Sequence, residues 1–272
     1  MIYLYVAFSF IFGLIIGSFI NCLIWRLHEK EGLWNRSYCP KCKHKISWYD
    51  NVPVLSFIFL LGKCRNCKEK ISYQYPLIEL LTAILFAVAF LIQFPISNFS
   101  LSEGSSTGGQ FLISDLLFLF RNFFIISVMI VIFIYDLRWY LILDIITLPA
   151  CLVVFIVNLM LGFEWQNLLI SGIIGGSFFL FQFVVSRGRW IGGGDIRLGL
   201  LMGFALGWPY ILVAIFLAYF MGAIISVGLV AGGKKKWGSK IPLGIFLSTA
   251  AIITLFWGDE ILNWYLGFIL AY

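Results

Sequence analysis

Three aspartates lie at the ends of apolar stretches, where a carboxylate is costly enough to indicate a functional role. Asp136 ends one stretch, Asp144 follows eight residues later, and Asp195 follows the three glycines 192–194. Two carboxylates that lie close together cannot both ionise easily, so one holds a proton while the other activates a water molecule. This pattern indicates hydrolysis of a peptide bond without a metal ion or a nucleophilic side chain.

Two of these aspartates also have simpler interpretations. Glycines 192–194 and Asp195 would equally suit a flexible turn with a solvated carboxylate. Asp144 precedes an apolar stretch and could cap the helix that starts there, although a cap could still take part in catalysis. Under the catalytic interpretation, the glycines allow a backbone bend that brings Asp195 and an extended substrate together.

Four cysteines form two C-x2-C pairs, with residues 43–63 between them. This spacing is typical of a zinc ribbon, in which two tight turns direct four thiolates at one ion and leave no open position for catalysis. Two disulfides are the alternative, but a reduced cytoplasmic loop favours a structural Zn²⁺. The predicted ligands are Cys39, Cys42, Cys64 and Cys67.

The composition shows which elements must position these groups. The chain has 272 residues, of which 61% are hydrophobic and 12% are charged. Soluble domains contain about 45–50% apolar and about 25% charged residues. A soluble globule, a disordered chain, a collagen and a coiled coil are therefore excluded, and the chain is expected to be an all-α polytopic membrane protein.

Eight apolar spans account for the pattern of charges along the chain. Asp115 and Arg121 suggest that the outer part of the third span lies in the membrane interface, and the stretch 261–272 is too short to cross. The predicted spans are 2–25, about 77–94, one ending near 135, about 145–161, 167–186, two within 198–230, and about 241–257.

Positive charge sets the predicted orientation. The net charge is +6, and ten of the nineteen Lys and Arg residues lie between Arg26 and Lys70. By the positive-inside rule this loop is cytoplasmic, the N-terminus and 97–110 are outside, and all three aspartates face the cytoplasm. The basic loop could bind nucleic acid or anionic lipid, but topology explains its charge and we expect no nucleic-acid partner.

Several further segments resemble those of the bacterial type IV prepilin peptidases, which belong to the Gly-x-Gly-Asp membrane aspartic proteases. The cysteine pairs belong to this resemblance, as does glycine-rich 192–195 with its Asp195. The other matching segments are Gly17-Ser18-Phe19-Ile20-Asn21, Arg26-Leu27, Ser37, Ser47-Trp48-Tyr49-Asp50-Asn51-Val52-Pro53, Gly62-Lys63, Ile71-Ser72, Tyr75-Pro76 and Glu79-Leu80-Leu81-Thr82.

The resemblance implies roles for the aspartates. Asp136 and Asp195 match the catalytic pair of the family, and Asp144 matches a supporting position that often follows a proline, where this chain has Leu143. Residues 241–244, Ile-Pro-Leu-Gly, match a further family segment whose role the sequence does not explain. The implied organisation is a first transmembrane helix (1–25), a cytoplasmic four-cysteine loop associated with methylation (26–76) and a transmembrane peptidase domain (77–272).

The resemblance also implies two activities at the inner membrane of a bacterium. The leader of type IV prepilins and pseudopilins is cut after a glycine at the cytoplasmic face, and the new N-terminus is methylated with S-adenosylmethionine. No dinucleotide-type fingerprint indicates where this methyl donor binds. Asp50, Asn51 and Glu79 are weak candidates, and hydrogen bonds that hold the loop on the membrane would explain them equally well. Neither the particular pilins nor an oligomeric state is indicated.

Two alternatives remain open from the sequence. Tyr135-Asp136 with a Gly-x-Gly-Asp segment also resembles presenilin-type and signal-peptide-peptidase proteases, although the chain has no Pro-Ala-Leu motif near its C-terminus. A transporter or a zinc-stabilised scaffold would need no catalysis, but transporters place polar sites near the midplane of the membrane. Here the aspartates are expected at one face.

Overall fold

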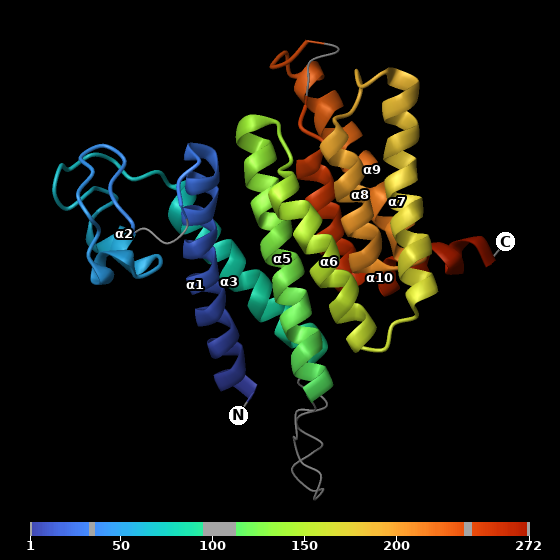
Figure 1. Cartoon of the computed structure of the whole chain (residues 1–272), viewed down its shortest axis with the longest axis horizontal. Coiled ribbons are helices and arrows are strands. Elements are labelled where there is room, and N and C mark those ends of the chain that lie inside the picture. Colours follow the sequence, from blue (N-terminus) through green and yellow to red (C-terminus); the bar gives the residue numbers. More distant parts are fainter. Residues whose placement is uncertain (1, 33–35, 95–112, 237–240, 271–272) are drawn as a thin grey trace, which may run out of the picture. The chain divides into compact units, whose positions relative to one another are not determined.

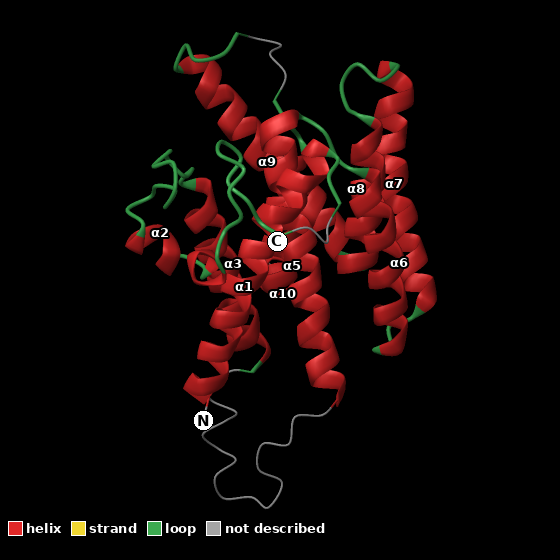
Figure 2. Ribbon diagram, turned by 60° about the vertical axis from the view of Figure 1, so that its left-hand side comes forward, coloured by secondary structure: helices red, strands yellow, loops and turns green. Residues whose placement is uncertain are grey.

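The computed structural model of the protein describes residues 2–32, 36–94, 113–236 and 241–270. These residues form helices and connecting loops without a named strand, as Figure 2 shows. The expectation of an all-α protein is therefore confirmed for this part of the chain. The helices are α1 (Ile2–Glu29), η1 (Trp48–Asn51), α2 (Leu55–Phe59), α3 (Gln74–Gln93), α5 (Ile113–Trp139), α6 (Asp144–Met160), α7 (Trp165–Ser186), α8 (Gly193–Leu206), α9 (Tyr210–Ala231) and α10 (Gly244–Leu270).

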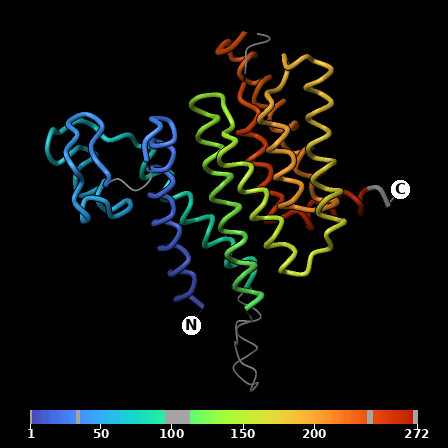
Figure 3. The backbone as a smooth tube through the Cα atoms, in the orientation of Figure 1, coloured from blue at the N-terminus to red at the C-terminus, as the bar shows by residue number. Residues whose placement is uncertain are grey.

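The chain divides into two compact units, Met1–Leu112 and Ile113–Tyr272. In the first unit α1 packs along α3, and Figure 3 follows the chain from α1 through the cysteine loop and back into α3. A Cβ atom at Gly17 would lie 2.7 Å from the Cα atom of Glu79, so the two backbones approach closely only because this position is a glycine. The helix that opens the predicted peptidase domain therefore packs on α1.

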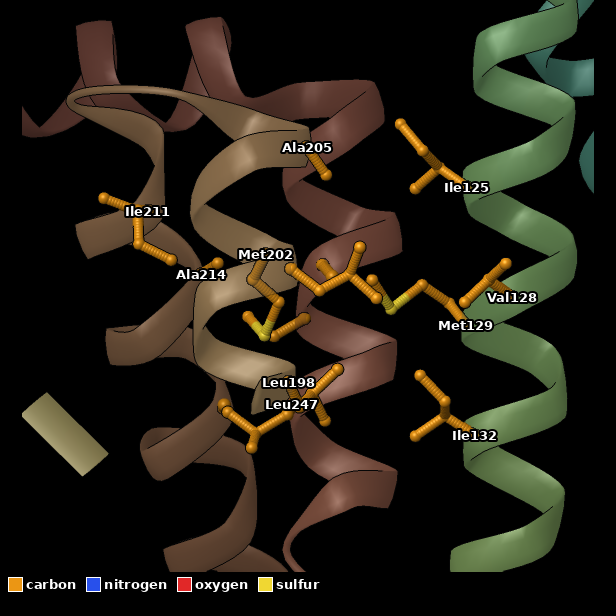
Figure 4. Close-up of a cluster of buried hydrophobic side chains, with 14 of the residues drawn as sticks. Ile125, Val128, Met129, Ile132, Leu198, Met202, Ala205, Ile211, Ala214 and Leu247 are labelled. Atoms are coloured by element: carbon orange, nitrogen blue, oxygen red, sulfur yellow. The ribbon is translucent and has the colours of Figure 1, made fainter. Parts of the chain in front are cut away.

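The second unit consists of α5 to α10 around an apolar core. Figure 4 shows Met129 and Ile132 of α5 directed toward α8 and α10, where Met202 and Leu247 are fully buried. Figure 1 follows the helices as they run alternately up and down. The C-terminal end of α5 and the first residues of α6, α8 and α10 consequently meet at one end of this unit.

The eight long helices lie where the sequence predicts eight spans. Six of the described helices, α1, α3, α5, α7, α9 and α10, are long and apolar enough to cross a membrane. With 17 and 14 residues, α6 and α8 are shorter than the roughly 20 residues that a crossing helix needs. The count of eight spans therefore stays a prediction. The predicted external loop 97–110 falls outside the described residues.

The end of the chain departs from regular helix at one point. Trp257 has φ −127° and ψ 22°, which places a kink inside α10 where the last span was expected to end. Beyond it the helix turns aside from the rest of α10 in Figure 1. The described residues after 260 thus form the part of α10 beyond the kink, and the expectation that they do not cross stays a prediction.

Arg121 is buried within the second unit, where the residue is 7% exposed, and the expectation that the outer part of this span lies in the membrane interface stays a prediction. The Nε atom of Arg121 donates to the Oδ1 atom of Asn158 on α6 at 2.6 Å, and its Nη2 donates to the carbonyl of Ala205 near the end of α8. A buried cation that donates to the last carbonyls of a helix is stabilised by the negative end of the helix dipole. Hydropathy along the sequence could not reveal this tertiary contact.

Candidate active site and metal site

Asp136 lies near the C-terminal end of α5 and faces the start of α10. The residue is 5% exposed. The Oδ2 atom accepts a hydrogen bond from the backbone N–H of Ile245 at 3.2 Å, and the backbone N–H of Gly244 also donates to the carboxylate. These are the first N–H groups of α10, which have no partner within that helix. The helix N-terminus therefore stabilises negative charge on Asp136.

Asp195 is the third residue of α8 and is also held by a helix start. Its Oδ2 atom accepts from the backbone N–H of Gly192 at 2.9 Å, and its residue is 7% exposed. A Cβ atom at Gly194 would lie 2.8 Å from the Cβ atom of Ile142, so this glycine permits close packing. The alternative of a flexible turn with a solvated aspartate is therefore wrong.

Asp136 and Asp195 come close enough to interact electrostatically. Within the described residues, the protein donors to each carboxylate are backbone N–H groups at a helix start. No side-chain cation there pairs with either of them. Two buried carboxylates that interact in this way can share one proton. The sequence separates the two residues by almost sixty positions, and the fold brings them together.

Asp144 has a different environment from the other two aspartates. It is the first residue of α6, whose N-cap is Leu143, and no side-chain hydrogen bond caps this helix. The proposed capping role is therefore wrong. Asp144 instead forms an ion pair with Arg197, two residues beyond Asp195 on α8. Arg197 was not singled out from the sequence, because its charge there indicates only topology.

The two cysteine pairs form matching turns. In each, the N–H of the first cysteine donates to the carbonyl five positions later, and its carbonyl accepts from the N–H four positions later. Lys43 and Lys68, with φ of 57° and 60°, adopt the left-handed conformation in equivalent places. The bonds measure between 2.8 and 3.0 Å and join Cys39 to Lys43 and His44, and Cys64 to Lys68 and Glu69.

These turns bring four thiols to one point. The four Sγ atoms lie within 4.8 Å of one another, and those of Cys39 and Cys67 are 3.8 Å apart. In a tetrahedral site with Zn–S distances of about 2.3 Å, neighbouring sulfur atoms are about 3.8 Å apart. All six cysteines are free thiols, so the alternative of two disulfides is not what this structure contains. The donor set fits a closed tetrahedral zinc site.

The thiols differ in acidity. The backbone N–H of His44 lowers the pKa of the Cys42 thiol to about 6. The backbone N–H of Glu69 lowers the pKa of Cys67, but desolvation and the hydrogen bonds to the other three thiols together raise it to about 11. Four adjacent sulfur atoms cannot all carry negative charge unless a cation joins them. Binding of a divalent metal would therefore release protons from this cluster.

Two of the candidates for the methyl-donor site hold the loop in place. The guanidinium of Arg65 donates to Asp50 at 2.6 and 2.8 Å, and this ion pair lowers the pKa of the Asp50 carboxyl. Glu79 on α3 accepts from the backbone N–H of Val54 at 2.7 Å and from the hydroxyl of Ser18. These contacts match the structural alternative raised from the sequence.

The comparisons with known proteins agree with this arrangement. Residues 11–93 match the model of the bacterial peptidase A24 N-terminal domain, and residues 123–227 match that of the type IV leader peptidase family. Proteins named prepilin leader peptidase/N-methyltransferase are similar over nearly their whole length. No solved structure matches the chain.

Three of these relatives illustrate the extent of the similarity. The protein from Aeromonas salmonicida is 31% identical over 98% of this chain and 96% of its own. The one from Bacillus subtilis is 31% identical over 94% of this chain and 96% of its own. The one from Pseudomonas aeruginosa is 28% identical over 97% of this chain and 94% of its own.

Proposed function

Because the chain belongs to the type IV leader peptidase family, we propose that it is a bifunctional enzyme of the bacterial inner membrane. It removes the leader of type IV prepilins and pseudopilins after a glycine and then N-methylates the new N-terminus. The observation that carries the proposal for cleavage is the meeting of Asp136 and Asp195, both buried, at one end of the second unit. The positive-inside rule assigns this end to the cytoplasmic side.

The proposed cleavage uses the two carboxylates as one acid–base unit. The ionised carboxylate takes a proton from water as the oxygen attacks the carbonyl of the leader glycine. The protonated partner donates its proton to that carbonyl oxygen, which gives a tetrahedral diol. As the diol collapses, the ionised carboxylate takes the proton of one diol hydroxyl, the C–N bond breaks, and the proton of the other carboxyl passes to the leaving amine. Asp136 and Asp195 are returned to the state in which they share one proton.

Asp144 supports this reaction from outside the pair. Its ion pair with Arg197 joins the start of α6 to the start of α8, which carries Asp195. We assign Asp144 to holding α8 in register with its neighbours. The side chains of both ion-pair partners are nearly half exposed, at 49% and 42%, so the pair contributes through position and adds little to stability.

The four cysteines hold zinc as a structural ion. A bound zinc ion would join the two matching turns of the loop and would neutralise sulfur atoms that otherwise repel one another. With four thiolate ligands it would have no open position for substrate. The sulfur atoms concerned are those of Cys39, Cys42, Cys64 and Cys67.

Methylation is assigned to the first unit, which contains the loop. S-adenosylmethionine would supply the methyl group. Asp50 and Glu79 are already engaged by protein donors, so their carboxylates fit the role of holding the loop better than that of binding the methyl donor. Asn51 lies on the exposed surface of η1 and stays a candidate.

A reconstituted reaction tests the proposal. The purified protein in lipid vesicles is given a prepilin, with or without S-adenosylmethionine, and leader removal and N-methylation are measured by mass spectrometry. We expect cleavage in both reactions and methylation only with the methyl donor. A prepilin whose leader ends in alanine in place of glycine serves as the matched substrate control. An intact prepilin after incubation with folded protein would contradict the proposal.

A further inference from the structure

The segment Ile241-Pro242-Leu243-Gly244 has no role that the sequence explains, and the structure places its last residue against Asp136. In the first turn of α10, the backbone N–H groups of Gly244 and Ile245 both donate to the Asp136 carboxylate. Gly244 itself is buried. The start of α10 thus touches one of the two carboxylates directly.

Gly244 also leaves no space for a side chain at this contact. A Cβ atom there would lie 2.7 Å from Oδ2 of Asp136, which is closer than real Cβ contacts, and 3.0 Å from its Cγ atom. The backbone of Gly244 does not have the positive φ that favours glycine. Alanine could therefore adopt the same backbone conformation. The need for glycine at this position comes from the carboxylate.

The two hydrogen bonds have a chemical consequence. They stabilise negative charge on Asp136 and fix the orientation of its Oδ2 atom, because both donors belong to one rigid helix start. No other donor to this carboxylate is found in the described part of the chain. A shift of Gly244 would therefore both rotate the carboxylate and weaken its only fixed donors.

We propose that residues 241–245 form a carboxylate clamp, in which Gly244 and Ile245 are positioning residues for Asp136 in the cleavage reaction. This inference rests on the proposed function, since it requires Asp136 to be catalytic. The clamp sets the direction of the Asp136 carboxylate toward the site that it shares with Asp195. It also explains why α10, which begins more than a hundred residues after Asp136, starts with a glycine.

The test compares Gly244→Ala with Gly267→Ala in vesicles. Gly267 lies on the same helix, and a Cβ atom there would meet nothing within 4 Å. We expect Gly244→Ala to lower kcat for leader removal by roughly 100-fold, because displacement of a catalytic group by about 1 Å can have that effect. KM should change by less than about twofold, since the clamp makes no contact with substrate in this proposal. Gly267→Ala should match the wild type.

The pH profile separates positioning from a general loss of structure. Loss of N–H donors disfavours the charged carboxylate, so the rising limb of kcat should move to higher pH in Gly244→Ala. A structural defect would lower kcat equally at every pH. The midpoint of thermal unfolding in detergent reports folding of the second unit, and it should be the same in Gly244→Ala as in Gly267→Ala. Wild-type kcat and an unshifted profile in Gly244→Ala would overturn the clamp.

Two further variants keep the test decisive. If Gly244→Ala does not accumulate, Ile245→Pro removes one donor at the first helical turn, where proline is accommodated. It should lower kcat and move the rising limb of the pH profile to higher pH, as Gly244→Ala does. An unchanged kcat would overturn the proposal.

Asp136→Asn distinguishes failure of the proposed function from failure of the clamp alone. Full cleavage by Asp136→Asn would contradict the proposed function, whereas an inactive Asp136→Asn beside a fully active Gly244→Ala would contradict the clamp alone.

Discussion

Arg197 on α8 forms an ion pair with Asp144 at the start of α6, and Arg197 stands two residues after Asp195. This pair links the third aspartate to the helix that carries a member of the proposed dyad. We therefore propose that Asp144 acts through the placement of α8 and does not share the role of Asp136 and Asp195.

Asp144→Asn should reduce leader removal less than Asp136→Asn does. We expect a fall in kcat/KM of roughly fivefold or less, because the amide keeps the size of the side chain and loses only an exposed ion pair of about 1 kcal/mol or less. A double-variant cycle with Arg197→Gln should show that the two changes are not additive. If Asp144→Asn abolishes cleavage to the same extent as Asp136→Asn, Asp144 belongs to the catalytic pair.

The pH dependence of leader removal should be bell-shaped. One carboxylate must be ionised and the other protonated, so activity is lost below the lower and above the higher apparent pKa of the pair. These values belong to the pair and to neither residue alone. The measurement is the rate constant of leader removal as a function of pH under single-turnover conditions, where chemistry limits the rate. A flat profile under those conditions would contradict a shared proton.

Removal of zinc should separate the two activities. The purified protein should contain about one zinc ion per chain, and a Cys39→Ser/Cys64→Ser variant should contain none. Because α5 to α10 form a unit with a core of their own, we expect this variant to retain cleavage and to lose methylation. Elemental analysis and the two activities, measured on the same sample, check this.

The control for that prediction is Cys22→Ser, since Cys22 lies in α1 outside the cluster. It should keep the metal and both activities. Loss of cleavage in the zinc-free variant, with the protein still inserted and monodisperse, would show that the loop is also part of the peptidase site.

Arg121→Met should destabilise the second unit. The substitution keeps most of the apolar stem but leaves the Oδ1 atom of Asn158 and the carbonyl of Ala205 without this donor. An unsatisfied buried polar group costs about 1–3 kcal/mol, so the midpoint of thermal unfolding in detergent should fall measurably. Arg138→Met is the matched control, because Arg138 is an exposed arginine on the same helix.

An unchanged midpoint for Arg121→Met would show that its contacts do not contribute to stability. A fall of equal size in Arg138→Met would indicate that any loss of charge from α5 has this effect. Either result would contradict a specific contribution of the Arg121 hydrogen bonds to stability.

The sequence predicts much of this fold because its signals are local. Apolar stretches and the basic clusters between them place all eight long helices, and two C-x2-C pairs predict a four-cysteine site. The up-and-down order of the helices then requires Asp136, Asp144 and Asp195 to lie at the same end of the second unit. Each of these predictions depends on spacing along the chain.

The parts that could not be predicted depend on contacts between distant residues. The burial of Arg121 depends on carbonyls at the end of α8, and the role of Gly244 on the approach of α10 to Asp136. Asp144 looks like a helix cap in the sequence, yet its partner is Arg197. Local propensity does not report which helix faces which, so these pairings required the structure.

The most direct test measures leader removal by Asp136→Asn and Asp195→Asn in vesicles, alongside methylation of a pilin that has already been cleaved. Asparagine keeps the size of each side chain and removes its ability to exchange a proton. We predict that both variants fail to remove the leader while they accumulate normally and still methylate the cleaved pilin. Leader removal at the wild-type rate by either variant would contradict the catalytic pair.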